Sequence, residues 1–382
     1  MTPPASPPQP VTAAGPHLGQ LPGLDGLRAI AAVSVFCYHS LWRTPALQPV
    51  GRVLGHGDVG VEIFFVMSGF LVARPVVAHV VRGAKPVAFV DFWRKRIARI
   101  WPAYLVALAG AIAVGVGEVH GLGGWLKHGL LVQTQFGDRG GTGLKVSWTL
   151  VVEVAFYVVL LPLGWVAAKA RRRPDDAWAT LCLTLFAVGA LALAVTSIGP
   201  TPTVLRVLPP FLPCFSAGML LAGVEAESER ATWSRLLFRS VRRLASRPLV
   251  CFGLAITVFV TMTVLLPASQ TAPALGLSGQ RAVQSFGQVA VAFLALTPLA
   301  LRTTSAPWLE QRALVALGSA SFGFYLWHIQ VLRLARPMLQ GSTVIVLGGL
   351  VVAFVGAYAA GEVSRRLIEE PARRALTRPR RR

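Results

Sequence analysis

Ten apolar runs, each long enough to cross a lipid bilayer as a helix, constrain this chain more than any other feature. Hydrophobic residues make up 54% of its 382 residues and charged residues only 14%, against roughly 25% charged in soluble domains. We therefore predict an all-α integral membrane protein of the cell membrane. The runs cover residues 27–44, 58–81, 97–117, 146–168, 177–198, 203–224, 249–267, 284–301, 314–336 and 342–364.

An eleventh apolar run, residues 123–136, is short and contains Lys127 and His128, so it could span the membrane or re-enter it. Basic residues of membrane proteins collect on the cytoplasmic side. If this run does not span and the N-terminus is inside, 28 of the 37 lysines and arginines lie inside. Counting the run as a span would place the Arg171–Arg173 run and the basic cluster of 225–247 outside. The charges favour about ten transmembrane helices with both termini cytoplasmic.

The membrane domain is predicted to cover residues 21–368, with a short tail on either side. Residues 1–20 are rich in proline, alanine and glutamine, which predicts disorder, and they lack the pattern of a cleaved signal peptide. Residues 369–382 form a basic cytoplasmic tail suited to anionic headgroups. The net charge of +21 is explained by this orientation, so no nucleic-acid partner is expected.

The four cysteines Cys37, Cys182, Cys214 and Cys251 all fall in apolar runs. Their spacing matches no metal-binding motif, so we interpret them as buried thiols and predict no metal.

The first apolar run begins beside Arg28 and contains His39 eleven residues later. Eleven residues are close to three helical turns, so both side chains lie on one face, ~16 Å apart along the axis. A histidine inside a membrane is costly, and a functional role is more probable there than in a soluble core. Neutral histidine is also the usual general base.

Three further ionisable residues are predicted at the depth of His39, in the outer half of the membrane: Glu153, His328 and Glu62. Glu153 could orient a histidine and stabilise its protonated form, although a carboxylate near a helix start also suits the helix dipole. His328 follows Tyr325 and Trp327, which could equally belong to an interfacial aromatic belt. Four helices thus converge on one level.

Four arginines are predicted at the cytoplasmic level: Arg28, Arg74, Arg96 and Arg99. Arg96 and Arg99 are three residues apart and share a helix face. Paired arginines can bind phosphate with two hydrogen bonds each. An anchor for anionic lipids is the alternative interpretation.

The chain resembles the membrane-bound acyltransferase-3 family of bacterial O-acyltransferases. The matching motifs occur in family order across almost the whole chain, and the one visible departure is Thr149, where the family often has serine. They are Leu24-Asp-Gly-Leu-Arg28 with His39, Val61–Leu71, Arg96-Ile-Ala-Arg99 before Trp101-Pro-Ala-Tyr104, Trp148-Thr-Leu-x-x-Glu153, Phe324-Tyr-Leu-Trp-His328 and Glu369-Glu-Pro-Ala-Arg373.

This resemblance implies transfer of an acyl group, often acetyl, from cytoplasmic acyl-CoA to a hydroxyl. By position, Arg28, Arg96 and Arg99 look like donor-side residues, with Arg74 widening the phosphate site. His39 looks like the catalytic base and Glu153 like its partner. Candidate donors to the oxyanion are Tyr325, Trp148 and Thr149, while Glu62 and His328 would orient the base or contact the acceptor.

The acceptor stays open at this stage. A sugar-containing or macrolide-like natural product is the expectation, with O-acetylation of an envelope or exopolysaccharide glycan as the alternative. A transporter or flippase of lipid-linked sugars is the competing class, but we find no inverted repeat of the kind many transporters have. A lipid-sugar-dependent glycosyltransferase is disfavoured because the 43–57 loop contains no acidic residue.

Overall fold

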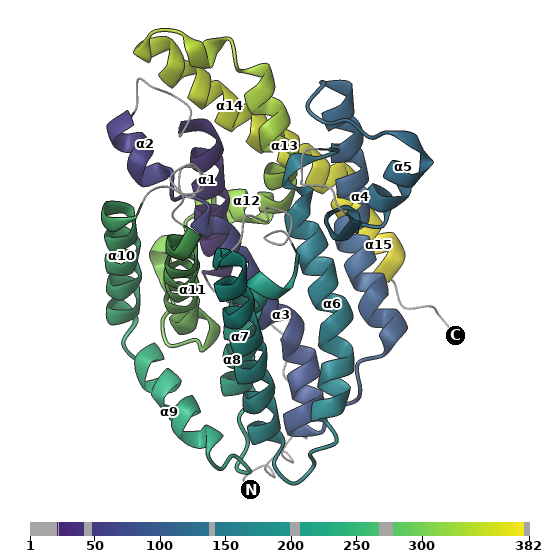
Figure 1. Ribbon diagram of the computed structural model, residues 1–382, viewed down its shortest axis with the longest axis vertical. Coiled ribbons are helices and arrows are strands. Elements are labelled where there is room, and N and C mark those ends of the chain that lie inside the picture. Colours follow the sequence, from purple (N-terminus) through teal and green to yellow (C-terminus); the bar gives the residue numbers. More distant parts are fainter. Residues whose placement is uncertain are drawn as a thin grey trace, which may run out of the picture.

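Helices account for every regular element in the part of the chain that the computed structural model describes, which is residues 21, 23–41, 48–136, 142–198, 207–266 and 278–377 (Figure 1). The all-α prediction is therefore confirmed, whereas residues 1–20 and 378–382 of the predicted tails lie outside the described residues. The α-helices are α1 Leu24–Leu41, α2 Gln48–Leu54, α3 Val59–Arg82, α4 Phe89–Ala113, α5 Gly121–Gly129, α6 Trp148–Ala167, α7 Pro174–Ile198, α8 Leu212–Ala226, α9 Ser234–Ala245, α10 Pro248–Leu265, α11 Ser278–Ala300, α12 Arg312–Ser319, α13 Ser321–Leu334, α14 Thr343–Ser364 and α15 Glu370–Thr377.

Each of the ten apolar runs contains a helix, but not all of these helices are long enough to cross a bilayer alone. Among the described residues, seven are sufficiently long and apolar, or eight if a bent pair counts as one span. Helix α8 has only 15 residues, which is ~22 Å of helix against a ~30 Å hydrocarbon core. The protein is an integral membrane protein, while the count of ten spans and the side of each terminus stay predictions.

The ninth apolar run is broken rather than continuous. Helices α12 and α13 meet at Ala320 with a bend of 75°. A close contact accompanies the bend, because a Cβ added to Gly318 would lie 1.8 Å from the Asp25 carbonyl oxygen of α1. The start of α13 is thereby held at the beginning of α1.

The 123–136 segment is not one continuous helix. It contains the nine-residue helix α5, ~14 Å long, followed by a 3₁₀ turn at Gln133–Phe136. Helix α5 is tied to α4 by Trp101 Nε1, which donates to the Gly129 carbonyl at 2.8 Å. The outer-face loop that the charge pattern predicts is consistent with this short helix.

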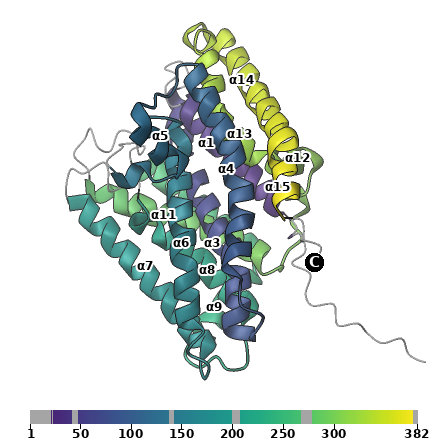
Figure 2. The same cartoon turned by 90° about the vertical axis from the view of Figure 1, so that its right-hand side faces the viewer.

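Helix α1 packs against α3, α12 and α13, and α3 packs in turn against α6, α8 and α11 (Figures 1 and 2). Glycines permit the tightest of these contacts. A Cβ on Gly60 would lie 2.2 Å from the Ala31 carbonyl of α1, and one on Gly218 would lie 2.0 Å from the Val66 carbonyl of α3. Helices α1 and α3, which contain predicted site residues, and their neighbour α8 are therefore in close backbone contact.

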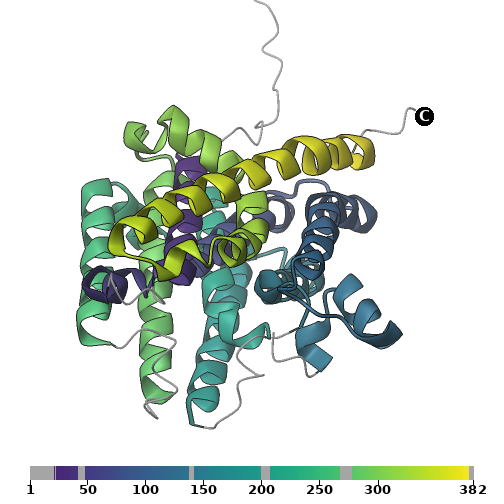
Figure 3. The same cartoon turned by 90° about the horizontal axis from the view of Figure 1, so that it is seen from above.

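The C-terminal helices lie across this bundle rather than along it. Helix α14 packs on α13 and runs obliquely over the other helices in the view from above (Figure 3). A π-helical turn, Arg365–Glu369, joins α14 to α15, and α15 packs on α4. This places the Glu369-Glu-Pro motif beside the helix that contains Arg96 and Arg99.

Candidate active site

A cavity lies between α3, α4, α6 and α13 and contains both polar and apolar walls. Its empty volume is about 830 Å³, counted to its open mouth. Its lining comes from five helices, α1, α3, α4, α6 and α13, and its apolar walls are aromatic and aliphatic. The lining residues are Arg28, Val61, Phe64, Phe65, Met67, Ser68, Leu71, Val72, Arg96, Arg99, Ile100, Thr149, Leu150, Glu153, Tyr157, Ser321, Phe322 and Tyr325.

Arg28, Arg96 and Arg99 line this one cavity, as the sequence predicts. Arg28 forms an ion pair with Asp25 at 2.7 Å. The Arg96 guanidinium stacks over the Tyr157 ring at 5.3 Å from its centroid, and its buried Nε has no hydrogen-bond partner. Three guanidinium groups beside one cavity make a site that can hold phosphate groups.

Arg74 does not belong to this group, which corrects the predicted phosphate site. Its Nε and one terminal nitrogen each donate to the Glu225 carboxylate at 2.7 Å. It is absent from the cavity lining. The expected depth of Arg74 along α3 does not fix the direction of its side chain, and the bidentate pair with Glu225 joins α3 to α8 instead.

Two hydroxyl groups, one from α6 and one from α13, meet on the cavity wall. Thr149 Oγ1 and Tyr325 Oη are 3.0 Å apart, and both are buried. Each is also within hydrogen-bond distance of the Val146 carbonyl, at 3.0 and 3.2 Å. Trp148, the third predicted oxyanion donor, does not line the cavity and packs against Phe211 instead.

Glu153 accepts hydrogen bonds from two residues that sequence reasoning missed. Ser68 Oγ donates to its Oε1 at 2.8 Å, and the Tyr157 hydroxyl donates to the same oxygen. Within the described residues His39 is not a hydrogen-bond partner of this carboxylate, so the expected direct pairing is not formed. Tyr157 could have been found from its spacing, because it lies four residues after Glu153 on the same face of α6.

His39 pairs with His328 instead. The His328 Nε2 and His39 Nδ1 atoms are 3.1 Å apart, although the two residues are 289 positions apart in sequence. His328 is buried and follows Tyr325 by one helical turn. Neither histidine lines the cavity. Tyr325 connects the cavity to the histidine pair, because Tyr325 lines the cavity and its carbonyl contacts His328.

Two backbone carbonyls fix the protons of this histidine pair. A carbonyl oxygen only accepts, so His328 Nδ1, 2.6 Å from the Tyr325 carbonyl, must carry a proton. By the same reasoning His39 Nδ1 carries a proton, because it lies 3.0 Å from the Val35 carbonyl. The His39 Nδ1–H is then shared between the Val35 carbonyl at 3.0 Å and His328 Nε2 at 3.1 Å, and the basic nitrogen of His39 is Nε2.

Glu62 lies in the first turn of α3 and is buried. Its Oε2 has no hydrogen-bond partner, and the residue does not line the cavity. Its predicted contact with the acceptor or the base stays a prediction.

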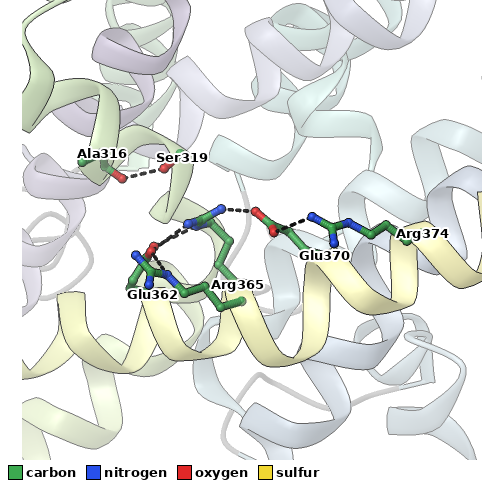
Figure 4. A network of polar contacts seen from close by, with 7 residues as sticks. Ala316, Ser319, Glu362, Arg365, Glu370 and Arg374 are labelled. Atoms are coloured by element: carbon green, nitrogen blue, oxygen red, sulfur yellow. Dashed lines mark hydrogen bonds and ion pairs between the residues drawn. The ribbon is translucent and has the colours of Figure 1, made fainter.

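A network of ion pairs holds the π-helical turn, which packs on α4 (Figure 4). Arg365 bridges Glu362, at 2.7 Å, and Glu370, and Arg374 also contacts Glu370 at 3.5 Å. The preceding Glu369 accepts a hydrogen bond from Ser364 at 3.3 Å. The C-terminal motif therefore stabilises the junction of α14 and α15.

Three curated relatives cover most of this chain. The O-acetyltransferase OatA of Staphylococcus aureus is 23% identical over 373 residues, which is 93% of this chain and 57% of OatA. The acyltransferase MdmB of Streptomyces mycarofaciens is 29% identical over 410 residues, 96% of this chain and 95% of MdmB. The putative peptidoglycan O-acetyltransferase YrhL of Bacillus subtilis is 26% identical over 390 residues, which is 94% of this chain and 55% of YrhL. The chain thus spans little more than half the length of OatA and YrhL.

No solved structure matches the chain significantly. The profile of the acyltransferase-3 family, which describes an acyltransferase domain, matches residues 21–362. This range includes every predicted site residue from Arg28 to His328. Because the profile matches well over half of the sequence, the chain belongs to the acyltransferase-3 family of membrane proteins.

Proposed function

We propose that the protein is a membrane O-acyltransferase that moves an acyl group, acetyl or another short acyl, from cytoplasmic acyl-CoA to a hydroxyl on an acceptor. One observation carries this proposal: a single cavity is lined both by three arginines and by the Thr149–Tyr325 hydroxyl pair. The carbonyl of Tyr325 in turn contacts His328 of the histidine pair. O-acetyltransferase names among the relatives support the same class of reaction.

The arginines would bind the phosphates of the donor. Arg99 is exposed, lines the cavity and makes no ion pair with a described residue, so its charge is available to a phosphate. The apolar walls, including Phe64 and Leu71, would contact the pantetheine arm and the acyl group. Arg28 and His39 lie ~16 Å apart along α1, a distance that a pantetheine arm can bridge.

His39 would act as the general base through Nε2. It removes the proton of the acceptor hydroxyl, whose oxygen forms a bond to the thioester carbonyl carbon. The carbon–sulfur bond then breaks, and the proton passes from His39 to the CoA thiolate, so that free thiol and the new ester are the products. Tyr325 or Thr149 would donate to the oxyanion by turning one hydroxyl proton away from the Val146 carbonyl, while the other proton keeps their mutual hydrogen bond.

His328 and Glu153 would be positioning residues. His328 accepts from the His39 Nδ1–H, which holds the ring and stabilises the imidazolium that forms during proton transfer. Glu153 would act through Tyr157, whose ring also supports the Arg96 guanidinium.

For the acceptor we propose a hydroxyl of a sugar-containing or macrolide-like product. The match to the acyltransferase MdmB of Streptomyces mycarofaciens, over 95% of that relative's length, supports this proposal. The alternative is an envelope glycan, favoured by the name of the Bacillus relative, a putative peptidoglycan O-acetyltransferase. Deleting the gene and comparing secreted products and cell-wall glycans by mass spectrometry separates the two, because only the true acceptor loses the acyl mass.

The catalytic proposal is tested with labelled acetyl-CoA and membranes that contain the protein. His39→Ala should reduce transfer by 100-fold or more, the usual contribution of a general base. His120→Ala, a histidine outside the cavity lining, is the matched control and should keep full transfer. Full transfer by His39→Ala would refute the base assignment. Movement of a lipid-linked sugar without any need for CoA would instead support the transporter class.

A further inference from the structure

A second hollow lies at the ends of α3 and α6 that we predict to be cytoplasmic. Its empty volume is about 1130 Å³ to its open mouth, and it shares no lining residue with the donor cavity. His79, Trp165, Lys169, Arg171 and Arg230 supply its polar and aromatic lining. We propose that this hollow binds the phosphate headgroup of an anionic phospholipid from the inner leaflet.

The charge of the hollow is positive and uncompensated. Lys169, Arg171 and Arg230 form no ion pair with any residue in the described ranges. Nearby arginines differ in this respect: Arg242 is paired with Glu227 at 3.1 Å and Arg74 with Glu225 at 2.7 Å. Three cations around one concave surface, without acidic partners, need an anion to balance them, and phosphate matches both lysine and arginine.

The outer face of α6 indicates that this anion belongs to a lipid. Val158, Pro162, Trp165 and Val166 are all exposed and follow one another at helical spacing along a single face. Lys169 continues the same face, one turn beyond Trp165. An acyl chain can therefore lie along this face while its headgroup enters the hollow.

Trp165 and Lys169 also have the chemistry expected where a helix leaves the membrane. Tryptophan is enriched at the interface between hydrocarbon and headgroups, and lysine places its charge among the phosphates while its stem stays apolar. A soluble phosphate compound would gain nothing from the exposed apolar face of α6. These observations favour an anionic phospholipid over free phosphate.

The test is thermal unfolding of the purified full-length protein in detergent, with added phosphatidylglycerol, phosphatidylcholine or inorganic phosphate. Phosphatidylglycerol should raise the Tm and the other two additions should not. In Lys169→Ala/Arg171→Ala/Arg230→Ala the apparent affinity for phosphatidylglycerol should fall more than tenfold, since one basic residue contributes roughly fivefold at an anionic surface.

The control variant removes the same charge from the same end of the molecule. Arg172, Arg173 and Arg239 are exposed and do not line the hollow. Their triple alanine variant should bind phosphatidylglycerol like the original protein. An equal loss in both variants would mean nonspecific surface charge, and an equal Tm shift with inorganic phosphate would mean a free-phosphate site; either result overturns the proposal.

Native mass spectrometry of the single variant Arg171→Gln covers the case in which the triple variant does not fold. It should retain fewer copies of phosphatidylglycerol than the original protein, and unchanged retention would contradict the proposal. Because neither experiment measures acyl transfer, the lipid site can fail while the proposed enzymatic function holds.

Discussion

His328→Leu should slow acyl transfer without weakening donor binding. In the structure His328 Nε2 lies 3.1 Å from His39 Nδ1 and is the acceptor of its proton. Leucine removes that acceptor, and the loss is largest when His39 becomes charged in the transition state. A hydrogen bond to a charged group contributes about 1.5–3 kcal/mol. At 1.36 kcal/mol per tenfold change, kcat should fall roughly 10- to 150-fold.

The matched variant is His328→Gln, whose side-chain oxygen can accept in place of Nε2. It should recover a large part of kcat. If His328 served only in packing, glutamine would not give a higher kcat than leucine. The assay follows transfer from labelled acetyl-CoA at varied donor concentration, in membranes with equal amounts of folded protein. An unchanged kcat in His328→Leu, or a change confined to the KM for acetyl-CoA, would refute the reasoning.

Three other predictions concern donor binding and packing. Arg99→Ala should raise the KM for acyl-CoA about tenfold or more and leave kcat nearly unchanged, since a phosphate loses one charged partner; steady-state kinetics measure this. Arg74→Ala should leave that KM unchanged but destabilise the protein by about 2 kcal/mol in thermal unfolding, because Glu225 loses its bidentate partner; Arg74→Met with Glu225→Met should recover most of the loss. Gly218→Ala should destabilise by about 1–3 kcal/mol because its Cβ would lie 2.0 Å from a carbonyl of α3. Gly253→Ala, with open space around it, should instead stabilise by about 0.5–1 kcal/mol.

Depth along a helix was predictable from sequence, and it located part of the site. Counting residues from each membrane face predicted that His39 and His328 share one level, and their ring nitrogens are 3.1 Å apart. The same counting grouped Arg28, Arg96 and Arg99, which line one cavity. Helical rise is nearly constant, so axial position follows directly from residue number.

The rotation of each helix about its axis was not predictable, and the differences between predicted and observed side-chain partners arise from this rotation. Arg74 has the expected depth but its side chain pairs with Glu225, and Glu153 contacts Ser68 and Tyr157 rather than His39. Nearly every face of a membrane helix is apolar, so the pattern that reveals the buried side in soluble proteins is weak here. Which side chains contact one another then depends on tertiary packing, and no pattern within a single sequence reveals that packing.

The break at Ala320 was not predicted, because no proline lies there and the nearby Gly318 and Gly323 are common residues in membrane helices. A long-range contact accompanies it: Gly318 of α12 approaches the Asp25 carbonyl of α1, while α13 packs on α14. Such a contact between residues 293 positions apart leaves no local signal in the run 314–336.

The two carbonyls that fix the histidine protons belong to the main chain, so they are beyond the reach of substitution. Replacing the side chain of Val35 or Tyr325 removes no acceptor, because each carbonyl persists as long as its helix does. Mutational drift around the site can thus change the size and polarity of the walls while the protonation pattern is inherited unaltered. Under the proposed function, Phe64 and Phe322 of the cavity wall are positions at which the size of the cavity can be varied without touching either carbonyl.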